Sequence, residues 1–189
     1  MAAFALVDVR RETLARSAKG DPGAFADLVR AHQSMVFSIT YHFLHDRAVA
    51  EELSQEVFLH LHKNLKAIQS PAHLVHWLRK VASHRCLDEA RRLKLRPRIS
   101  LTDYLERSPE PAAEFRMADP LLSGALRRLV ARLPERSRMI VILRFQEDLD
   151  PAEIAETLDI PLGTVKSNLH RSLALLRGKL EREGKGLSR

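Results

Sequence analysis

Apolar residues recur every three to four positions along most of this chain, which is the spacing of amphipathic helices. The pattern is nearly continuous from about Glu12 to Arg92, and a second stretch runs from Leu121 to about Arg182. Between them, residues 96–120 hold four prolines and show no sustained period. We therefore predict an all-α protein in which two small helical domains are joined by a flexible linker.

The first stretch is predicted to form three helices after residue 20, each with a recognisable start. Asp21 before a proline, Asp46 after a Leu-His break and Ser70 before another proline are typical capping residues. The buried positions predicted for the second helix are Val49, Leu53, Val57, Leu61 and Leu65. Those predicted for the third helix are Leu74, Trp77 or Leu78, Val81 and Leu87.

The second stretch begins with two short amphipathic helices separated by Pro134. The first is predicted to bury Leu126, Leu129 and Leu133. The second is predicted to bury Met139, Ile140, Ile142, Leu143 and Phe145.

Residues 150–177 then read as two helices joined by a tight turn. Asp150 and Glu153 have the spacing of a capping box, and Asp159 falls where the turn needs a left-handed residue. On the second helix, the residues facing inward are Val165, Leu169, Ser172 and Leu176. The residues facing outward are Gly163, Lys166, Ser167, His170, Arg171 and Ala174. Small residues and donors on that face predict a helix-turn-helix reader of double-stranded DNA; the alternative is a solvated helical hairpin.

Charge and composition agree with a polyanionic partner, since the formal net charge is +7. A hydrophobic content of 45% is ample for a core, and the single cysteine, Cys86, excludes an internal disulfide. No apolar run is long enough to span a bilayer. We expect a soluble cytoplasmic protein without membrane insertion.

The chain shows no pattern typical of catalysis. It lacks a Gly-rich phosphate loop, a nucleophile elbow and an isolated pair of carboxylates, so we predict that it is not an enzyme and needs no cofactor. His42 with His45, and His73 with His76, have a spacing that suits a metal ion. The ligand count stays below that of a closed zinc site, and no metal site is predicted.

Two surfaces of the first domain carry further chemistry. An acidic and apolar strip on its second helix, formed by Glu52, Gln55, Glu56 and Leu59, suits a basic protein partner. The third helix presents cations around Trp77, which favours stacking on unpaired bases; plain core packing is the alternative for this ring. The pair Arg91-Arg92 is equally compatible with a solvated helix end.

The segments DRAVAEELSQEVFLHLHKNL and HWLRKVASHRCLDEARR resemble region 2 of bacterial sigma factors of the sigma-70 family, in particular the extracytoplasmic function (ECF) group. LRRLVARLPERSRMIVILRF with AEIAETLDIPLGTVKSNLHRS resembles region 4 of the same group. The resemblance implies a region 2-like domain at residues 21–95, a linker at 96–120 and a region 4-like domain at 121–183. Residues 1–20 form an N-terminal extension and 184–189 a tail.

The resemblance also implies partners and site residues. The partners are promoter DNA, an anti-sigma factor and core RNA polymerase, through the coiled coil of its largest subunit and the flap of its second subunit. Polymerase-binding residues are Glu52, Leu53, Gln55, Glu56 and Phe58. Residues for capture and melting of the −10 element are Asn64, Lys66, Ser70, His73, Trp77 and Lys80. Residues that read the −35 element are Thr164, Lys166, Ser167, His170 and Arg171.

The expected function is initiation at promoters of a stress- or signal-responsive regulon. The chain departs from the family at Asn168, where Arg is frequent, and at residues 173–175, where further basic residues are frequent. The residues alone are also compatible with two other functions. One is a stand-alone helix-turn-helix regulator that binds a palindrome as a dimer, and the other is a helical adaptor for a protein partner.

Overall fold

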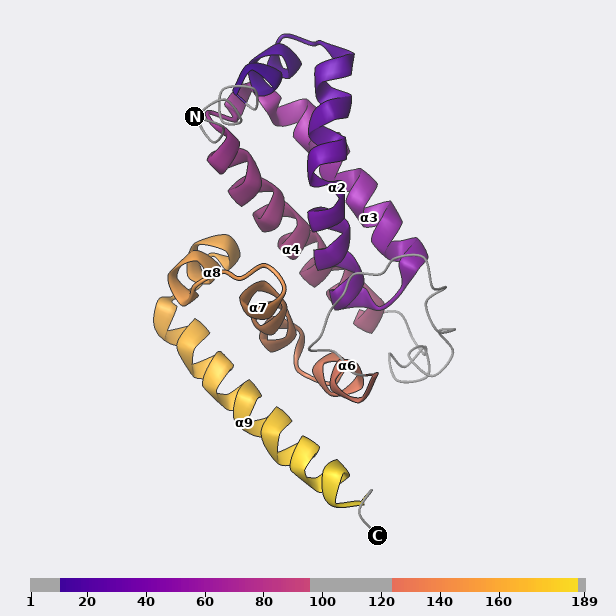
Figure 1. The fold of residues 1–189 in the computed structure, drawn as a ribbon, viewed down its shortest axis with the longest axis vertical. Coiled ribbons are helices and arrows are strands. Elements are labelled where there is room, and N and C mark those ends of the chain that lie inside the picture. The colour runs from indigo at the N-terminus through magenta and orange to yellow at the C-terminus, as the bar shows by residue number, and fades with distance from the viewer. Residues whose placement is uncertain (1–10, 96–123, 187–189) are drawn as a thin grey trace, which may run out of the picture. The chain divides into compact units, whose positions relative to one another are not determined.

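The computed structural model describes residues 11–95 and 124–186, and the part it describes is helical with short connections (Figure 1). Residues 11–18 form a first helix. The elements that follow are α2 (Pro22–Leu44), α3 (Arg47–Asn64), the 3-10 turn η1 (Leu65–Ala67), α4 (Pro71–Leu95), α6 (Gly124–Ala131), α7 (Glu135–Phe145), α8 (Pro151–Leu158) and α9 (Leu162–Gly186). The all-α prediction is confirmed. The predicted linker at 96–120 lies outside the described residues.

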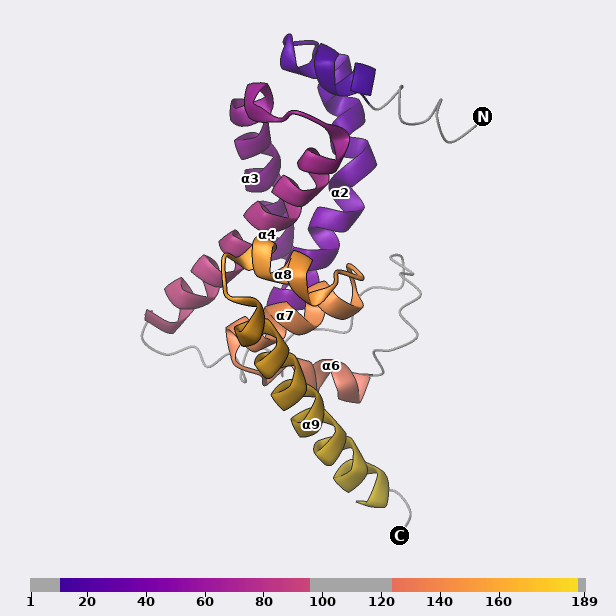
Figure 2. The same cartoon turned by 90° about the vertical axis from the view of Figure 1, so that its left-hand side faces the viewer.

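The chain divides into two compact units, residues 1–88 and residues 89–189. In the first, α2 and α3 pack side by side, as Figures 1 and 2 both show. The predicted break between them is confirmed, because His45 adopts left-handed geometry at a φ of 56° and Asp46 caps α3 by accepting from Val49 N at 3.0 Å. The Asp46 carboxylate thus defines where α3 begins.

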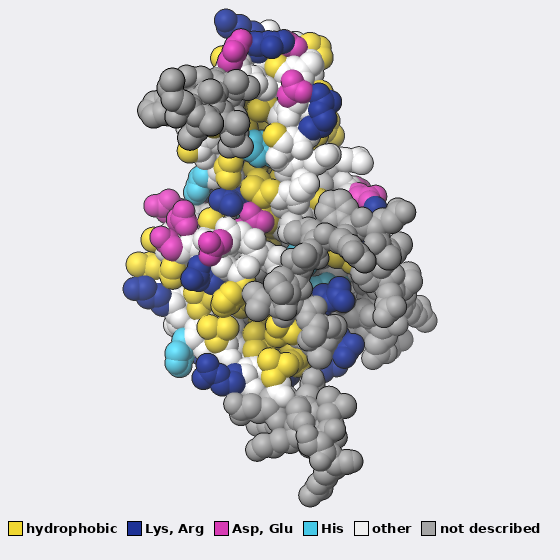
Figure 3. All heavy atoms as spheres, viewed as in Figure 1, with side chains coloured by type: hydrophobic (Ala, Val, Ile, Leu, Met, Phe, Trp, Pro, Cys, Tyr) yellow, Lys and Arg dark blue, Asp and Glu magenta, His cyan; other side chains and the backbone are white. Residues whose placement is uncertain are grey.

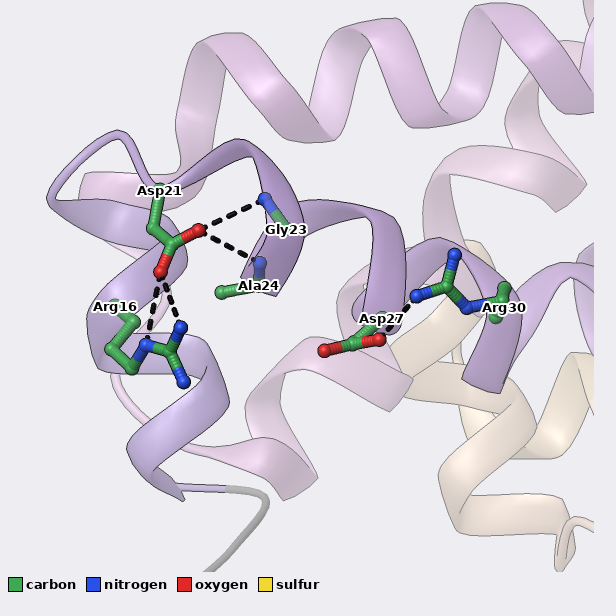
Figure 4. A network of polar contacts seen from close by, with 6 residues as sticks. All are labelled: Arg16, Asp21, Gly23, Ala24, Asp27 and Arg30. Carbon is green, nitrogen blue, oxygen red and sulfur yellow. Dashed lines mark hydrogen bonds and ion pairs between the residues drawn. The ribbon is translucent and has the colours of Figure 1, made fainter.

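Asp21 anchors the start of α2 and ties it to the preceding helix (Figure 4). Its Oδ1 accepts from the backbone N–H groups of Gly23 and Ala24 at 2.9 and 3.1 Å. Its Oδ2 accepts from Nε and Nη2 of Arg16 at 3.0 and 2.6 Å. The backbone hydrogen bond from Ala24 and the Arg16 guanidinium lower the pKa of the Asp21 carboxyl. Since Leu14 is also buried, the helix at 11–18 is part of the folded unit.

The core of the first unit decides one open choice in the predicted α4 stripe and corrects two of its positions. Leu78, and not Trp77, is the fully buried member of that pair, and Trp77 is half-buried. Val81 and Leu87 are also only half-buried, while Ala82 and Cys86 take the inward positions. The buried residues follow a spacing of four along the helix, which rotates the stripe away from the predicted three-residue steps.

In the second unit, α7 contacts α6, α8 and α9, and α9 contacts the other three helices. These contacts bury α7 from Ser137 to Leu143, which confirms most of its predicted core. Phe145 is the exception, since its side chain is 46% exposed. It lies two residues beyond Leu143, about 200° around the helix, and ends α7. None of the described helices is long and apolar enough to cross a membrane.

Candidate nucleic-acid interface

The turn between α8 and α9 forms as the sequence predicts. Asp150 Oδ1 accepts from Ala152 N at 2.7 Å and Glu153 N at 2.9 Å, and Glu153 Oε2 accepts from Asp150 N at 2.8 Å. This reciprocal pair is a complete capping box. Asp159 ends α8 in left-handed geometry, with a φ of 52° and a ψ of 48°. The turn therefore directs the chain into α9 without a glycine.

The two faces of α9 separate as predicted. The inward set, Val165, Leu169, Ser172 and Leu176, is buried. The outward set, Gly163, Lys166, Ser167, His170, Arg171 and Ala174, is exposed. Within the second unit the buried stripe meets α6, α7 and α8, so the outward set is the surface of α9 that is open to a DNA groove.

Charge is distributed unevenly over the two helices. Figure 3 shows acidic side chains gathered over α8 and basic side chains spaced along α9. The exposed side chains of α8 include Glu153 and Glu156, and those of α9 include Lys166 and Arg171. An approaching phosphate backbone is thus attracted to α9 and repelled from α8, which orients the duplex on the second helix.

Hydrogen bonds organise the predicted −35 residues among themselves. Arg171 donates from Nε to Ser167 O and from Nη2 to Ser167 Oγ, both at 3.1 Å. Ser167 Oγ in turn donates to Thr164 O at 3.1 Å. Thr164 is half-buried, whereas Ser167 and Arg171 are exposed. The guanidinium is therefore tied to the helix at Ser167 while the side chain stays exposed.

One contact of this site was not predicted from the sequence. Asn168 Nδ2 donates to Thr164 O at 2.7 Å, and its Oδ1 accepts from Ser137 Oγ of α7 at 2.9 Å. The only signal in the sequence is the family departure at Asn168. The partner, Ser137, is buried and lies 31 positions earlier, which no local pattern can reveal.

The residues predicted for the −10 element lie along the connection from α3 to α4. Asn64 Nδ2 donates to His60 O at 2.8 Å at the end of α3. Ser70 Oγ accepts from His73 N at 3.1 Å and so caps α4. Lys66 is exposed on η1, and Lys80 is half-buried on α4. The polar groups of this segment therefore also hold the local backbone.

Trp77 was predicted either to pack in the core or to be accessible for stacking, and the structure shows part of each. Its ring packs edge-to-face against His60, with the centroids 5.3 Å apart and an interplanar angle of 76°. The side chain is half-buried, so part of the ring remains accessible. It is thus neither a sealed core residue nor a free platform.

The predicted polymerase-binding residues divide by burial. Glu52 and Gln55 are exposed, and Glu56 is half-buried, with its Oε2 3.8 Å from Arg85 Nη1 of α4. Leu53 and Phe58 are only 7% and 8% exposed, because both pack into the core behind the strip. The apolar residue of the surface is Leu59, which is 65% exposed.

The histidine pairs considered as metal ligands do not assemble. Among the residues that the structure describes, no group of three or more His, Cys, Asp and Glu side chains is placed to hold an ion. His42 is buried in α2, and the Cys86 side chain is buried in α4.

Taken together, the geometry defines a helix-turn-helix protein with a second helical unit that carries an acidic and apolar strip. Comparison with known proteins places it more narrowly. The family model "Sigma-70 region 2" matches residues 28–96, and "Sigma-70, region 4" matches residues 123–176, so the two matches together cover more than half of the chain. The chain belongs to the sigma-70 family, and its relatives are sigma factors of the ECF group.

Two relatives match over most of both chains. The ECF RNA polymerase sigma factor SigW of Bacillus subtilis (strain 168) is 28% identical over 171 residues, covering 86% of this chain and 91% of SigW. The ECF RNA polymerase sigma-E factor of Escherichia coli (strain K12) is 29% identical over 175 residues, covering 88% and 91%.

A solved structure agrees in fold. The sigma factor RpoE of Bartonella quintana, in complex with the anti-sigma factor NepR, matches with a TM-score of 0.62 and 14% identity. The match covers 83% of this chain and 96% of RpoE. At this identity the likeness concerns the fold alone.

Proposed function

We propose that the protein is an alternative sigma factor that delivers core RNA polymerase to promoters with two short elements. The observation that carries this proposal is the division of α9, with Val165, Leu169, Ser172 and Leu176 buried and Lys166, Ser167, His170 and Arg171 exposed. That face presents donors for phosphates and for base edges of the −35 element. In this proposal the chain recognises the promoter and opens the duplex, and polymerase catalyses RNA synthesis.

In this proposal the first unit serves the −10 element and polymerase. The connection from Asn64 to Trp77 captures unpaired bases, and Lys66 and Lys80 hold the backbone beside them. Unstacking costs on the order of a few kcal/mol per base step, and capture of a flipped base offsets that cost. The strip of Glu52, Gln55, Glu56 and Leu59 binds the coiled coil of the largest polymerase subunit. Leu53 and Phe58 support the strip from the core.

Control by an anti-sigma factor is part of the same proposal. The RpoE structure holds such a factor, and the matched fold supports an equivalent partner for this chain. The regulon would then respond to a stress or signal that releases the protein. This partner is predicted to cover surfaces that polymerase also uses.

Run-off transcription tests the proposal. Genomic fragments are transcribed by core RNA polymerase with and without the full chain. We expect discrete starts that depend on the protein and share two upstream elements. Arg171→Ala is expected to weaken promoter binding by about 1–3 kcal/mol. Arg128→Ala removes the same charge from an exposed position on α6, and this matched control should bind as the wild type does.

Two results would overturn the proposal. Tight binding to a palindromic duplex as a dimer, with no polymerase-dependent start, would identify a stand-alone regulator. Capture of a protein partner with neither duplex binding nor transcription would identify an adaptor.

A further inference from the structure

A continuous path of hydrogen bonds joins the core of the second unit to the exposed face of α9. It starts at the buried Ser137 of α7, whose hydroxyl donates to Asn168 Oδ1 at 2.9 Å. Asn168 Nδ2 donates to Thr164 O at 2.7 Å, and that oxygen also accepts from Ser167 Oγ at 3.1 Å. Ser167 then receives Nη2 of Arg171, also at 3.1 Å. Each link joins a donor to an acceptor, and the path ends at a predicted −35 residue.

The chemistry of the links determines the orientation of the Asn168 amide. A backbone carbonyl can only accept, so the group that approaches Thr164 O has to be the NH₂ of Asn168. Its oxygen is then directed to Ser137, whose hydroxyl can donate. The amide is thus fixed at both ends, and one end lies on a different helix.

A contact of this kind opposes rotation of α9 about its own axis. The buried stripe of α9 is apolar apart from Ser172, and apolar packing is non-directional. The hydrogen bond from Ser137 is directional, and it lies at the edge of the stripe. A roll of about 10° moves a side-chain tip about 5 Å from the helix axis by about 1 Å. A shift of this size is enough to break a base-edge hydrogen bond, which tolerates about 0.5 Å.

We propose that Asn168 and Ser137 are positioning residues for −35 recognition. They fix the rotation of α9 and the placement of the Arg171 guanidinium, and neither has to contact DNA. The inference rests on the proposed function, because it concerns how the same face reads bases. It also accounts for the departure at Asn168: the position connects the helix to its own core and is therefore not available as a DNA contact.

The test measures base discrimination by the complete holoenzyme. Polymerase carrying the full chain is bound to the promoter obtained by run-off transcription and to versions with single substitutions in the −35 element. Ser137→Ala cuts the first link. Asn168→Asp keeps the acceptor for Ser137 but removes the donor to Thr164 O, and it changes only a half-buried side chain. Ser172→Ala is the matched control, because it also removes a buried serine hydroxyl, here from the inward face of α9 itself.

We expect Ser137→Ala and Asn168→Asp to reduce discrimination at the base pair read by Arg171 by about tenfold, the order supplied by one base contact. Binding to unrelated duplex should change less than twofold for Ser137→Ala, because no phosphate contact is lost. Ser172→Ala should retain wild-type discrimination. In the Arg171→Ala background, Ser137→Ala should have no further effect at that base pair, since the residue that it positions is absent.

The outcomes distinguish failure of the proposed function from failure of the positioning role. If the wild-type holoenzyme shows no discrimination at the −35 element, the proposed function fails. If the wild type discriminates while both variants keep its profile, the positioning role is wrong and the proposed function stands. A loss in Ser172→Ala equal to that in Ser137→Ala would assign the effect to general loosening of the core and overturn the inference. Additive effects of Ser137→Ala and Arg171→Ala would do the same.

Discussion

Removal of the Thr40 hydroxyl is expected to weaken the first unit by about 1 kcal/mol, the net value of one buried hydrogen bond. Thr40 is 0% exposed and lies on α2 with its hydroxyl facing α3. Its Oγ1 is 3.1 Å from Ser54 Oγ and 3.2 Å from Ala50 O across the helix pair. It is also 3.0 Å from Phe37 O within its own helix. The hydroxyl has one proton, so these contacts together amount to about one strong bond at a time.

A second change at Ser54 allows the contribution of the Thr40–Ser54 hydrogen bond to be measured separately. Ser54 Oγ donates to Ala50 O at 2.7 Å within α3, so it keeps a partner when Thr40 is changed. Thr40→Val removes the hydroxyl at nearly constant shape, and Ser54→Ala removes the other member of the pair. Each single variant loses the hydrogen bond between Thr40 and Ser54, and the double variant loses it once. The loss of unfolding free energy in the double variant should therefore be smaller than the sum of the two single losses by about 0.5–1.5 kcal/mol.

The assay uses the only tryptophan of the chain. Trp77 lies in the first unit, so its fluorescence during urea unfolding reports that unit even if the second unfolds separately. Thr40→Ser is the control, because it keeps the hydroxyl and should preserve the coupling with Ser54. Effects of Thr40→Val and Ser54→Ala that add to within about 0.3 kcal/mol would show that the pair does not join the helices.

Acidification should weaken the first unit through Asp21, since hydrogen bonds from a backbone amide and from Arg16 lower the pKa of its carboxyl. The stabilisation is present above the unfolded pKa, about 3.9 for an aspartate, so the stability gap between wild type and Asp21→Asn should close as the pH falls from there through the lower folded pKa in urea titrations. Asp150→Ala should cost the second unit about 1 kcal/mol by loss of the capping box, measured by circular dichroism; an unchanged midpoint would refute that role. Leu78→Ala should cost about 2–5 kcal/mol because Leu78 is 0% exposed, whereas Leu59→Ala should stay within about 0.5 kcal/mol. Equal costs in tryptophan-monitored unfolding would contradict the assigned burial.

Helix boundaries were predictable because they depend on neighbours in sequence. Asp21, Asp46 and Asp150 each accept from backbone N–H groups two or three residues ahead. Asp159 adopts left-handed geometry at the predicted turn. Such interactions are complete within one helical turn, so residue type and spacing were sufficient to infer them. The separation of the two faces of α9 followed from the helical period in the same way.

Choices between neighbouring side chains were less predictable. Periodicity did not distinguish Leu78 from Trp77, and it placed Phe145 in the core although its side chain is 46% exposed. Family resemblance grouped Leu53 and Phe58 with the residues of a partner surface, and it did not indicate that both side chains are buried. These outcomes depend on which helices pack against each position, and that information is not local.

The reading face of α9 is sparsely charged, and this affects how selectivity arises. Among the predicted −35 residues, only Lys166 and Arg171 carry a permanent positive charge. Even if both contacted phosphates, they would give a salt slope of only about −2, well below that of proteins with many phosphate contacts. These two contacts alone would then bind duplex DNA weakly. In the proposed holoenzyme both units engage one promoter, and linkage raises affinity by about 10²–10⁴ without a new contact. Selectivity consequently depends less on the number of contacts than on how precisely each is placed, and a directional tie such as that from Ser137 to Asn168 provides such placement.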